Sequence, residues 1–515
     1  MNPAGLPENS SEIRQGSYCP RSRSRLSIRW MLALVVLILL ACNLSVSTPP
    51  ATQPTLTQKP SPSPQLVVWR SGPTSTPFQP IAPTQPTASS QPPTLTATPW
   101  PTYAIANLHD GPWPPPNSDG PGPTPATQVP PPYPIFSGKD SLNFLLLGSD
   151  SGSASFRTDT LIIASVQPKA HLVTLISIPR DLFVYIPGWT MNRVNTAYMH
   201  GEMVKYPGGG KALLKDTLLY NLGLRIDHIA KVDFEGFEKI IDSLGGIDIP
   251  LVCAFTDWHI KNPRRSDQDP SNWELYTIGP GVVHMDGDLA LWYARSRQRS
   301  SDFDRGRRQQ EVLRAIYSRS MQLEVVLHIP KLYKEIKDAV TTDLSLKDLL
   351  NLAPLAADLG GEHHIRSFYI NRDAVTSWRT PYGAAVQLPD HQALQALLAT
   401  AMAPPDEIDE KQMETLIEIR NGTSNLDWDA LAAQRLHYAG YETRLVPFDQ
   451  SDHERTKLYT FTSTPDSRRT VDLVRLLGLS NSSLVSVPDQ ESEIDYRLVL
   501  GEDYNPCFDP TKLPD

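Results

Sequence analysis

Charged residues lie beside apolar runs at three places in one part of the 515-residue chain, and two of these places hold both an acidic and a basic residue. Asp150 ends the triplet Gly-Ser-Asp, Asp159 follows Arg157 in Arg-Thr-Asp, and Arg180 directly precedes Asp181. Carboxylates that lie close together repel each other unless a cation lies between them, and a divalent ion with oxygen ligands suits that place. Guanidinium groups offer paired donors to phosphate oxygens. These residue types favour a site for a divalent cation and a phosphate-bearing substrate.

Three short apolar runs must position these residues, and they cover residues 143–147, 160–166 and 171–178. Their length, their β-branched residues and the Gly, Pro, Ser or Asp at their ends predict strands rather than helices. In an antiparallel meander, the end of the first, the start of the second and the end of the third share one edge, about 4.8 Å apart from strand to strand. The charged residues would then converge on one patch. Taken singly, each is equally well explained as a turn residue or half of a surface ion pair.

A second group of basic residues follows the apolar run 289–293 and continues into a helix predicted over residues 302–321. Spacings of three and four residues place Arg305, Arg308 and Gln309 on one side of that helix. Arg295 and Arg297 come just before it. So many guanidinium groups repel each other without an anion, which favours an anion site. A solvated basic face and a nucleic-acid patch are the alternatives.

The remainder of this region predicts layered α/β packing. Residues 226–232 form a predicted strand, Asp233 caps a helix over residues 234–241, and residues 247–252 form another strand. Gly210-Lys211 hints at a phosphate loop, but Ala212 occupies the position of the Ser or Thr that holds magnesium, which excludes a nucleotide triphosphatase. Lys211 still begins a predicted helix that ends at Gly223, where it could meet an anion.

Composition excludes several classes of protein. The net charge of −9 gives no reason to expect a nucleic-acid binder. The four cysteines are scattered without a Cys-x-x-Cys pair, so a zinc site is not expected. The 49 prolines are too many for one globular unit, and most of them lie in one stretch near the N-terminus.

The N-terminal part predicts export and attachment to the membrane. Residues 1–29 are basic and are expected to stay in the cytoplasm, and residues 30–46 are apolar. This apolar segment fits an uncleaved signal anchor or a lipoprotein signal with Cys42 as the lipidated residue. Residues 47–136 are dominated by Pro, Thr, Ser, Gln and Ala and predict a disordered, extended linker. The rest of the chain is therefore expected on the extracytoplasmic face of the cell membrane.

The C-terminal part predicts a separate small domain. After a polar linker at residues 403–411, strands are predicted at 415–420, 443–447 and 495–500, and helices at 431–439 and 471–477. This pattern favours a two-layer α/β domain over residues 412–505.

The order of motifs resembles that of the LytR-CpsA-Psr family of cell-envelope proteins, with a catalytic domain over residues 137–403. The motifs are Gly-Ser-Asp150, Arg157-Thr-Asp159-Thr, Ser177-Ile-Pro-Arg180-Asp181, Asn195-Thr-Ala-Tyr, Asp233-Phe-Glu-Gly-Phe, Leu244-Gly-Gly-Ile-Asp-Ile, Ala294-Arg-Ser-Arg297 and Asp302-Phe-Asp-Arg305-Gly-Arg-Arg308-Gln309-Gln310. The end of the chain is similar to the LytR C-terminal domain, in Glu418-Ile-Arg-Asn-Gly-Thr423 and Leu498-Val-Leu-Gly-Glu-Asp503. The fold that this resemblance implies is a mixed central sheet flanked by helices.

The resemblance implies a phosphotransferase that moves a glycan phosphate from a polyprenyl-pyrophosphate carrier to peptidoglycan. By motif, Asp150 and Asp159 would hold Mg2+ and Arg180 would act with them in catalysis. The pyrophosphate would be bound by Arg157, Arg180, Lys211, Arg295, Arg297, Arg305, Arg308 and Gln309. The general base stays open between Asp150, Asp159 and metal-bound solvent. Asp304 stands where the family usually has Gly.

Two other functions remain as alternatives. One is hydrolysis of the same pyrophosphate with water as the acceptor. The other is a non-enzymatic, membrane-bound attenuator or regulator of transcription. Direct contact with DNA is disfavoured, because only about thirty residues are expected in the cytoplasm and they contain no helix-turn-helix pattern.

Overall fold

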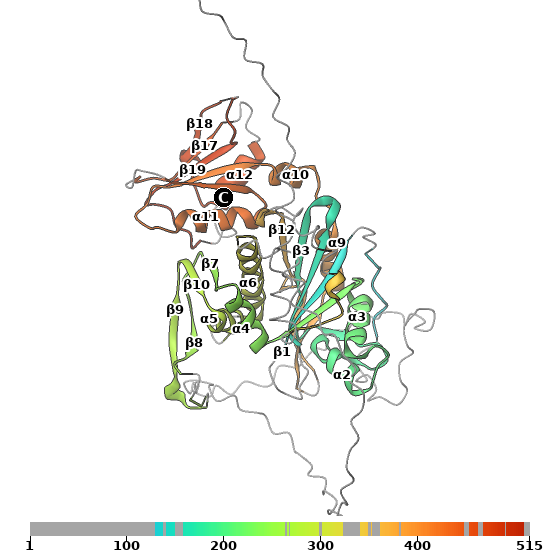
Figure 1. The fold of residues 1–515 in the computed structure, drawn as a ribbon. Helices are drawn as coiled ribbons and strands as arrows, with labels where there is room; N and C mark the ends of the chain where they lie inside the picture. The colour runs from blue at the N-terminus through green and yellow to red at the C-terminus, as the bar shows by residue number, and fades with distance from the viewer. Residues whose placement is uncertain are drawn as a thin grey trace, which may run out of the picture.

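The computed structural model describes residues 129–136, 141–149, 158–262, 265–266, 268–297, 301–322, 340–348, 352, 361–380, 383–447, 453–461, 467–489 and 491–508 (Figure 1). Within these residues no helix is both long enough and apolar enough to cross a membrane. The predicted membrane segment at residues 30–46 and its Cys42 lie outside the described residues.

A six-stranded mixed sheet forms the centre of the larger domain, in the order β11-β6-β1-β2-β3-β12. The predicted antiparallel meander is confirmed: it consists of β1 (Leu142–Ser149), β2 (Thr158–Gln167) and β3 (Leu172–Ser177). Three further strands extend it: β6 (His228–Asp233) runs parallel to β1, β12 (Ile365–Tyr369) runs parallel to β3, and β11 (Val340–Thr342) runs antiparallel to β6.

Helices cover both faces of this sheet, so the predicted fold class is confirmed. Side chains alternate between the two faces of a strand. Leu145 and Ile163 therefore pack against one group of helices: α2 (Ala197–Met203), α3 (Gly209–Leu222) and α9 (His391–Met402). Phe144 and Ile162 pack against the other group: α4 (Phe234–Ser243), α5 (Gly287–Arg295) and α6 (Asp302–Gln322).

Local sequence explains where these helices begin and end. The Asp233 carboxylate accepts a hydrogen bond from the Gly236 amide at 2.8 Å and starts α4, as predicted. Asp286 caps α5 in the same way through the Leu289 amide. Gly223 ends α3 with a φ of 66°, a conformation that glycine adopts without a steric penalty.

Four two-stranded units surround the sheet. They are β4 (Phe183–Tyr185) with β5 (Met191–Arg193), β7 (Ile247–Leu251) with β10 (Gly281–Met285), β8 (Phe255–Ile260) with β9 (Trp273–Ile278), and β13 (Val375–Arg379) with β14 (Ala385–Pro389). Of these strands, β7 is the one that the sequence predicts.

The C-terminal domain is a five-stranded sheet with helices, in the order β16-β15-β19-β17-β18. The strands are β15 (Leu416–Asn421), β16 (Glu442–Val446), β17 (Lys457–Thr460), β18 (Leu484–Ser486) and β19 (Tyr496–Leu500), and the helices are α11 (Trp428–Tyr438) and α12 (Ser467–Leu476). A short helix, α10 (Glu407–Met413), begins inside the predicted polar linker 403–411, where Lys411 and Glu407 pair at 2.7 Å.

A disulfide, a hydrogen bond and helix packing hold the two domains together, in addition to the polypeptide linker. A disulfide links Cys253 to Cys507, with 4.7 Å between their Cα atoms. The Asp427 carboxylate accepts a hydrogen bond from the Val282 amide at 3.1 Å. Helix α11 lies against the larger domain, next to β7, β10 and β12 (Figure 1). The sequence alone did not predict this disulfide.

The predicted linker 47–136 is wrong at its C-terminal end. Residues 129–136 lie along α3, where the Tyr133 amide donates to the Tyr220 carbonyl and the Phe136 amide to the Gly223 carbonyl. The Tyr133 side chain is buried, and its hydroxyl donates to the His391 carbonyl at 2.7 Å. Tyr133 and Phe136 supply apolar surface that packs against the larger domain.

Candidate active site

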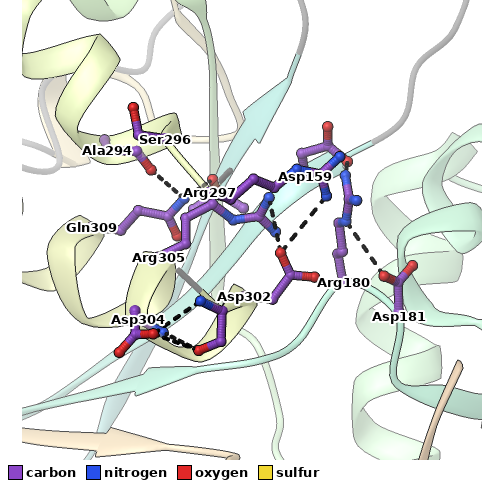
Figure 2. A network of polar contacts seen from close by, with 12 residues as sticks. Asp159, Arg180, Asp181, Ala294, Ser296, Arg297, Asp302, Asp304, Arg305 and Gln309 are labelled. Atoms are coloured by element: carbon purple, nitrogen blue, oxygen red, sulfur yellow. Dashed lines mark hydrogen bonds and ion pairs between the residues drawn. The ribbon is translucent and has the colours of Figure 1, made fainter. Parts of the chain in front are cut away.

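The edge of the meander carries a cluster of alternating charges, as the sequence predicts. Arg180, just after β3, lies between two carboxylates (Figure 2). Its Nη1 is 2.9 Å from Oδ1 of Asp159 in β2, and its Nε is 3.5 Å from Oδ2 of Asp181. Arg193 reaches the other oxygen of Asp181 at 3.3 Å. The convergence of Asp159, Arg180 and Asp181 on one patch is confirmed.

The start of α6 adds a second part to this cluster. The Asp302 carboxylate lies 3.4 Å from Nη1 of Arg305 and 3.7 Å from Nη1 of Arg297, which follows α5 (Figure 2). Figure 2 shows these residues beside Arg180, and the charge of Asp302 also acts on Arg180. Residues from two distant segments of the sequence therefore form one group, which we call the charged cluster: Asp159, Arg180, Asp181, Arg297, Asp302 and Arg305.

Burial and neighbouring charges act in opposite directions on the arginines. Burial lowers the pKa of Arg180, but the attraction of Asp159 and Asp181 is greater, so its pKa lies above the usual value. For Arg305 burial prevails, with added repulsion from Arg180 and Arg297, so its pKa lies below the usual value. A further anion next to Arg305 would relieve this unfavourable environment.

Gln309 and Arg295 connect the charged cluster to the helices behind it. The Gln309 amide donates to the Thr160 hydroxyl at 2.9 Å and to the Ala294 carbonyl at 3.3 Å, which ties α6 to β2 and α5. The Arg295 guanidinium lies 3.8 Å from the centre of the Phe234 ring at the start of α4.

An apolar cavity of about 130 Å³ opens between the sheet and helices α4, α5 and α6. Thr160, Asp233, Arg295 and Gln309 are the polar residues in its wall. The rest is apolar and includes Leu146, Ala230, Val232, Phe234, Phe237, Ile240, Val312 and Ile316. A smaller cavity of about 30 Å³ continues along the same face of the sheet and shares Leu146 and Leu313 with the first. The site thus combines polar residues that adjoin the charged cluster with an interior suited to a hydrocarbon chain.

Arg308 does not join the charged cluster. It is fully buried, and its guanidinium donates to the Ser296 carbonyl and lies 4.4 Å from the centre of the Phe255 ring. Helical spacing places residues 305, 308 and 309 on one side of α6, but that side is wide enough to meet two neighbours. Arg305 and Gln309 meet the sheet edge and the cavity, whereas Arg308 meets α5 and β8. Burial against these elements corrects the prediction that Arg308 lies with the phosphate-binding residues.

Other predicted site residues are outside the charged cluster or outside the described part of the chain. Lys211 lies on α3, and its charge acts on Lys231, whose ammonium group is 4.9 Å from the centre of the Tyr198 ring. Asp150, Arg157 and Cys42 lie outside the described residues.

Sequence reasoning missed the role of Asp302. The sequence predicts Asp302 only as the first residue of a helix, whereas in the structure it is also the partner of both Arg297 and Arg305. Its position three residues before Arg305 is the signal that could have revealed it, because residues i and i+3 of a helix are neighbours.

The described residues fit magnesium only in part. They contain no group of three or more His, Cys, Asp or Glu residues arranged to hold a metal ion. Asp159 forms an ion pair with Arg180. Ser149, the last described residue before Asp150, lies opposite Thr158 in the sheet, next to Asp159 in the sequence. Mg2+ is usually held by one or two carboxylates together with water and substrate phosphates, and the carboxylate chemistry of Asp159 suits this mode.

Comparison with known proteins shows which curated proteins the chain is similar to. The chain is 30% identical over 221 residues to the polyisoprenyl-teichoic acid–peptidoglycan teichoic acid transferase TagU of Oceanobacillus iheyensis, over 42% of this chain and 63% of that protein. It is 31% identical to the corresponding transferase TagV of Bacillus subtilis, over 38% of this chain and 47% of TagV. The chain thus spans less than two thirds of the length of these curated relatives.

A solved structure of B. subtilis TagV is 26% identical to the chain, with a TM-score of 0.42, and the match covers 51% of this chain and 96% of that one. The model of the LytR_cpsA_psr family matches residues 123–402, which is more than half of the chain. The resemblance seen in the motifs is therefore confirmed, and the chain belongs to the LytR_cpsA_psr family.

Proposed function

We propose that this protein is a phosphotransferase that moves a glycan phosphate from a polyprenyl-pyrophosphate carrier to peptidoglycan. The glycan is a teichoic-acid-like, capsular or other secondary wall polymer. The relatives named as teichoic acid transferases support this proposal. The observation that carries it is the charged cluster next to an apolar cavity, because a polyprenyl pyrophosphate has one anionic part and one hydrocarbon part.

In this proposal the charged cluster binds the diphosphate. Arg180, Arg297 and Arg305 replace part of their contacts with Asp159, Asp181 and Asp302 by contacts with phosphate oxygens. Phosphoryl transfer depends mainly on positioning and on neutralising charge on the oxygens, and fixed guanidinium groups supply both. The hydrocarbon chain enters the cavity between the sheet and helices α4, α5 and α6.

The bond changes follow from the two substrates. A peptidoglycan hydroxyl oxygen forms a bond to the phosphorus next to the glycan, and the bond from that phosphorus to the bridging oxygen breaks. Polyprenyl phosphate leaves with the bridging oxygen, and the proton of the hydroxyl passes to a carboxylate of the charged cluster or to solvent.

Magnesium is part of the proposal. Asp159, together with Asp150, would hold Mg2+, which would neutralise charge on the phosphate oxygens when bound.

The cell membrane, on its extracytoplasmic face, is the proposed location. The apolar segment 30–46 supports it, as a signal anchor or a lipoprotein signal. The Cys253–Cys507 disulfide also supports it, because disulfides form and persist mainly in oxidising compartments.

The proposal is tested with the purified full chain and a donor that carries a labelled glycan phosphate on polyprenyl pyrophosphate. Release of polyprenyl phosphate is measured for the natural sequence, for Arg180→Ala and for Arg225→Ala. Arg225 is the matched control, since its side chain is 68% exposed and pairs with Asp227 before β6. The expected result is a loss of at least about a hundredfold in kcat/KM for Arg180→Ala, comparable to the removal of one preorganised oxyanion donor. Undiminished release by Arg180→Ala would contradict the proposal.

A further inference from the structure

The sheet of the C-terminal domain has helices packed on one of its faces. Ile417, Leu458 and Leu498 point to that face and form an apolar core with α11 and α12. Because side chains alternate along a strand, the residues between them point to the opposite face. In the described part of the domain, no helix contributes to an apolar core on that opposite face.

This second face carries a group of arginines. Arg420 lies in β15, Arg444 in the neighbouring strand β16, and Arg497 in the strand on the other side, β19. Glu418 pairs in register with both Arg444 and Arg497. We call the surface formed by Arg420, Arg444 and Arg497 the arginine face. It stands out in a chain whose net charge is −9.

Glu418 orients two of the three guanidinium groups. Its Oε1 accepts a hydrogen bond from Nε of Arg420 at 2.8 Å and from Nε of Arg497 at 2.6 Å. Burial raises the pKa of Glu418, but the hydrogen bonds and positive charges of Arg497 and Arg420 together outweigh it and hold this pKa below its usual value. The Glu418 side chain is only 10% exposed, whereas those of Arg420 and Arg497 are 29% and 31% exposed. One buried carboxylate thus anchors two guanidinium groups that stay accessible.

Further contacts hold Arg497 and the domain that carries it. The Arg497 guanidinium lies 5.1 Å from the centre of the Phe461 ring. The domain itself is fixed to the larger domain by the Cys253–Cys507 disulfide and by the packing of α11. A guanidinium group that is already oriented loses less conformational entropy when it binds an anion.

We propose that the arginine face binds the phosphodiester backbone of an anionic glycan polymer. Arg444 and Arg497 lie on either side of Glu418, one strand away from it in each direction, and Arg420 lies two residues further along β15. Because neighbouring strands lie about 4.8 Å apart, the three arginines form a triangle across β16, β15 and β19 that an extended polyanion can contact. Planar guanidinium groups match phosphate oxygens in charge and geometry. The identity of the polymer rests on the proposed function, in which such a polymer is the group transferred. The domain then holds the polymer while the larger domain carries out the transfer.

The test measures binding of the purified full chain to fluorescent poly(glycerol phosphate), which carries no polyprenyl group. The variant Arg444→Gln with Arg497→Gln removes two positive charges from the arginine face. We expect its affinity to fall at least about tenfold at 0.1 M salt, and binding by the natural sequence to weaken as salt increases. Arg497→Lys, which keeps the charge but not the planar fork, should show an intermediate loss.

The matched control is Arg468→Gln with Arg475→Gln on α12, which removes the same charge from two exposed residues on the helical side of the domain. Its affinity should stay unchanged. An equal loss in the control would mean that net charge alone matters and would overturn the proposal. The single variants Arg444→Gln and Arg497→Lys serve if the double variant fails to fold. Unchanged polymer affinity in both folded single variants would also overturn the proposal.

Three further arms separate this proposal from other sources of binding. Hyaluronan, a carboxylate polymer, should bind more weakly, and equal binding would overturn the assignment to phosphate. Binding to vesicles that contain phosphatidylglycerol should not change in the arginine-face variants. If vesicle binding alone depended on these arginines, a membrane surface would be the partner and the proposal would be overturned. Arg225→Ala, at an exposed arginine that belongs to neither the charged cluster nor the arginine face, should leave polymer affinity unchanged. Since no arm measures transfer, failure here is distinguishable from failure of the proposed function.

Discussion

The apolar cavity gives a prediction that separates binding of the hydrocarbon chain from binding of the diphosphate. Ala230, in β6, lines the cavity and pairs with Leu146 of β1, which lines it as well. The change Ala230→Phe places an aromatic ring into this space. Because the ring fills an existing cavity, we expect the variant to fold. The variant should bind the diphosphate normally and exclude part of the donor's hydrocarbon chain from the cavity.

The size of the effect follows from the volume. An engineered apolar cavity of roughly 150 Å³ binds benzene, so a cavity of about 130 Å³ has room for one isoprene unit. Burial of one CH2 group contributes about 0.8 kcal/mol, so the roughly five carbons of an isoprene unit contribute about 4 kcal/mol when fully buried and about 2 kcal/mol when half buried. Exclusion of this unit therefore raises the Kd of the donor by roughly 30-fold to 1000-fold.

The assay compares two donors, one with a full polyprenyl chain and one with the chain truncated to a short alkyl group. For Ala230→Phe the KM should rise strongly with the long donor and little with the short one. Ala385→Phe is the matched control, because it adds the same ring to an exposed position of β14. If folded Ala230→Phe kept the natural KM for the long donor, the cavity would not be the site of the hydrocarbon chain.

Three other predictions concern stability. Arg308→Ala removes a fully buried cation that lies on an aromatic ring, and should lower the free energy of unfolding by roughly 2–4 kcal/mol in denaturant titrations. Arg297→Ala changes a side chain that is 46% exposed, so it should lower activity and leave the free energy of unfolding nearly unchanged. Equal losses of stability would contradict this assignment. Cys253→Ser removes the interdomain disulfide and should lower stability by roughly 2–5 kcal/mol, and reductant should then have no further effect on thermal unfolding. Burial raises the pKa of Asp343, but its hydrogen bonds, among them the one from Lys215 at 2.8 Å, hold it well below the usual value. Its stabilising effect is therefore complete above the unfolded pKa of about 3.9 and disappears as the pH falls below it. The difference in unfolding free energy between the natural chain and Asp343→Asn should be constant near neutral pH and shrink below about pH 4, and a difference independent of pH would refute the role of the carboxylate.

The fold could largely be predicted because the sequence marks its elements locally. The strands of the meander are short apolar runs with clear ends, and Asp233 and Gly223 mark the start of α4 and the end of α3. Such signals depend on a few neighbouring residues, so they can be read without knowledge of the rest of the chain. The strands of the β8–β9 pair lack them: Trp273 to Ile278 alternates poorly and is mostly exposed.

The site could be predicted in part. Asp159, Arg180 and Arg305 follow from motif and strand order, and the structure brings them together. Arg308 could not be assigned correctly, because helical spacing gives the neighbours within a helix but not which side of a wide face meets another element. The Cys253–Cys507 disulfide could not be predicted either, because the two residues are 254 positions apart and their proximity depends on how the domains pack.

The central claim is that one site transfers a glycan phosphate between a lipid carrier and peptidoglycan. The most direct measurement gives the full chain both substrates, with the label on the glycan phosphate, and follows the label. We predict a labelled phosphodiester adduct of peptidoglycan and an equal amount of polyprenyl phosphate. Label that appears only as free glycan phosphate, with water as the acceptor, or no release of polyprenyl phosphate at all would contradict the claim.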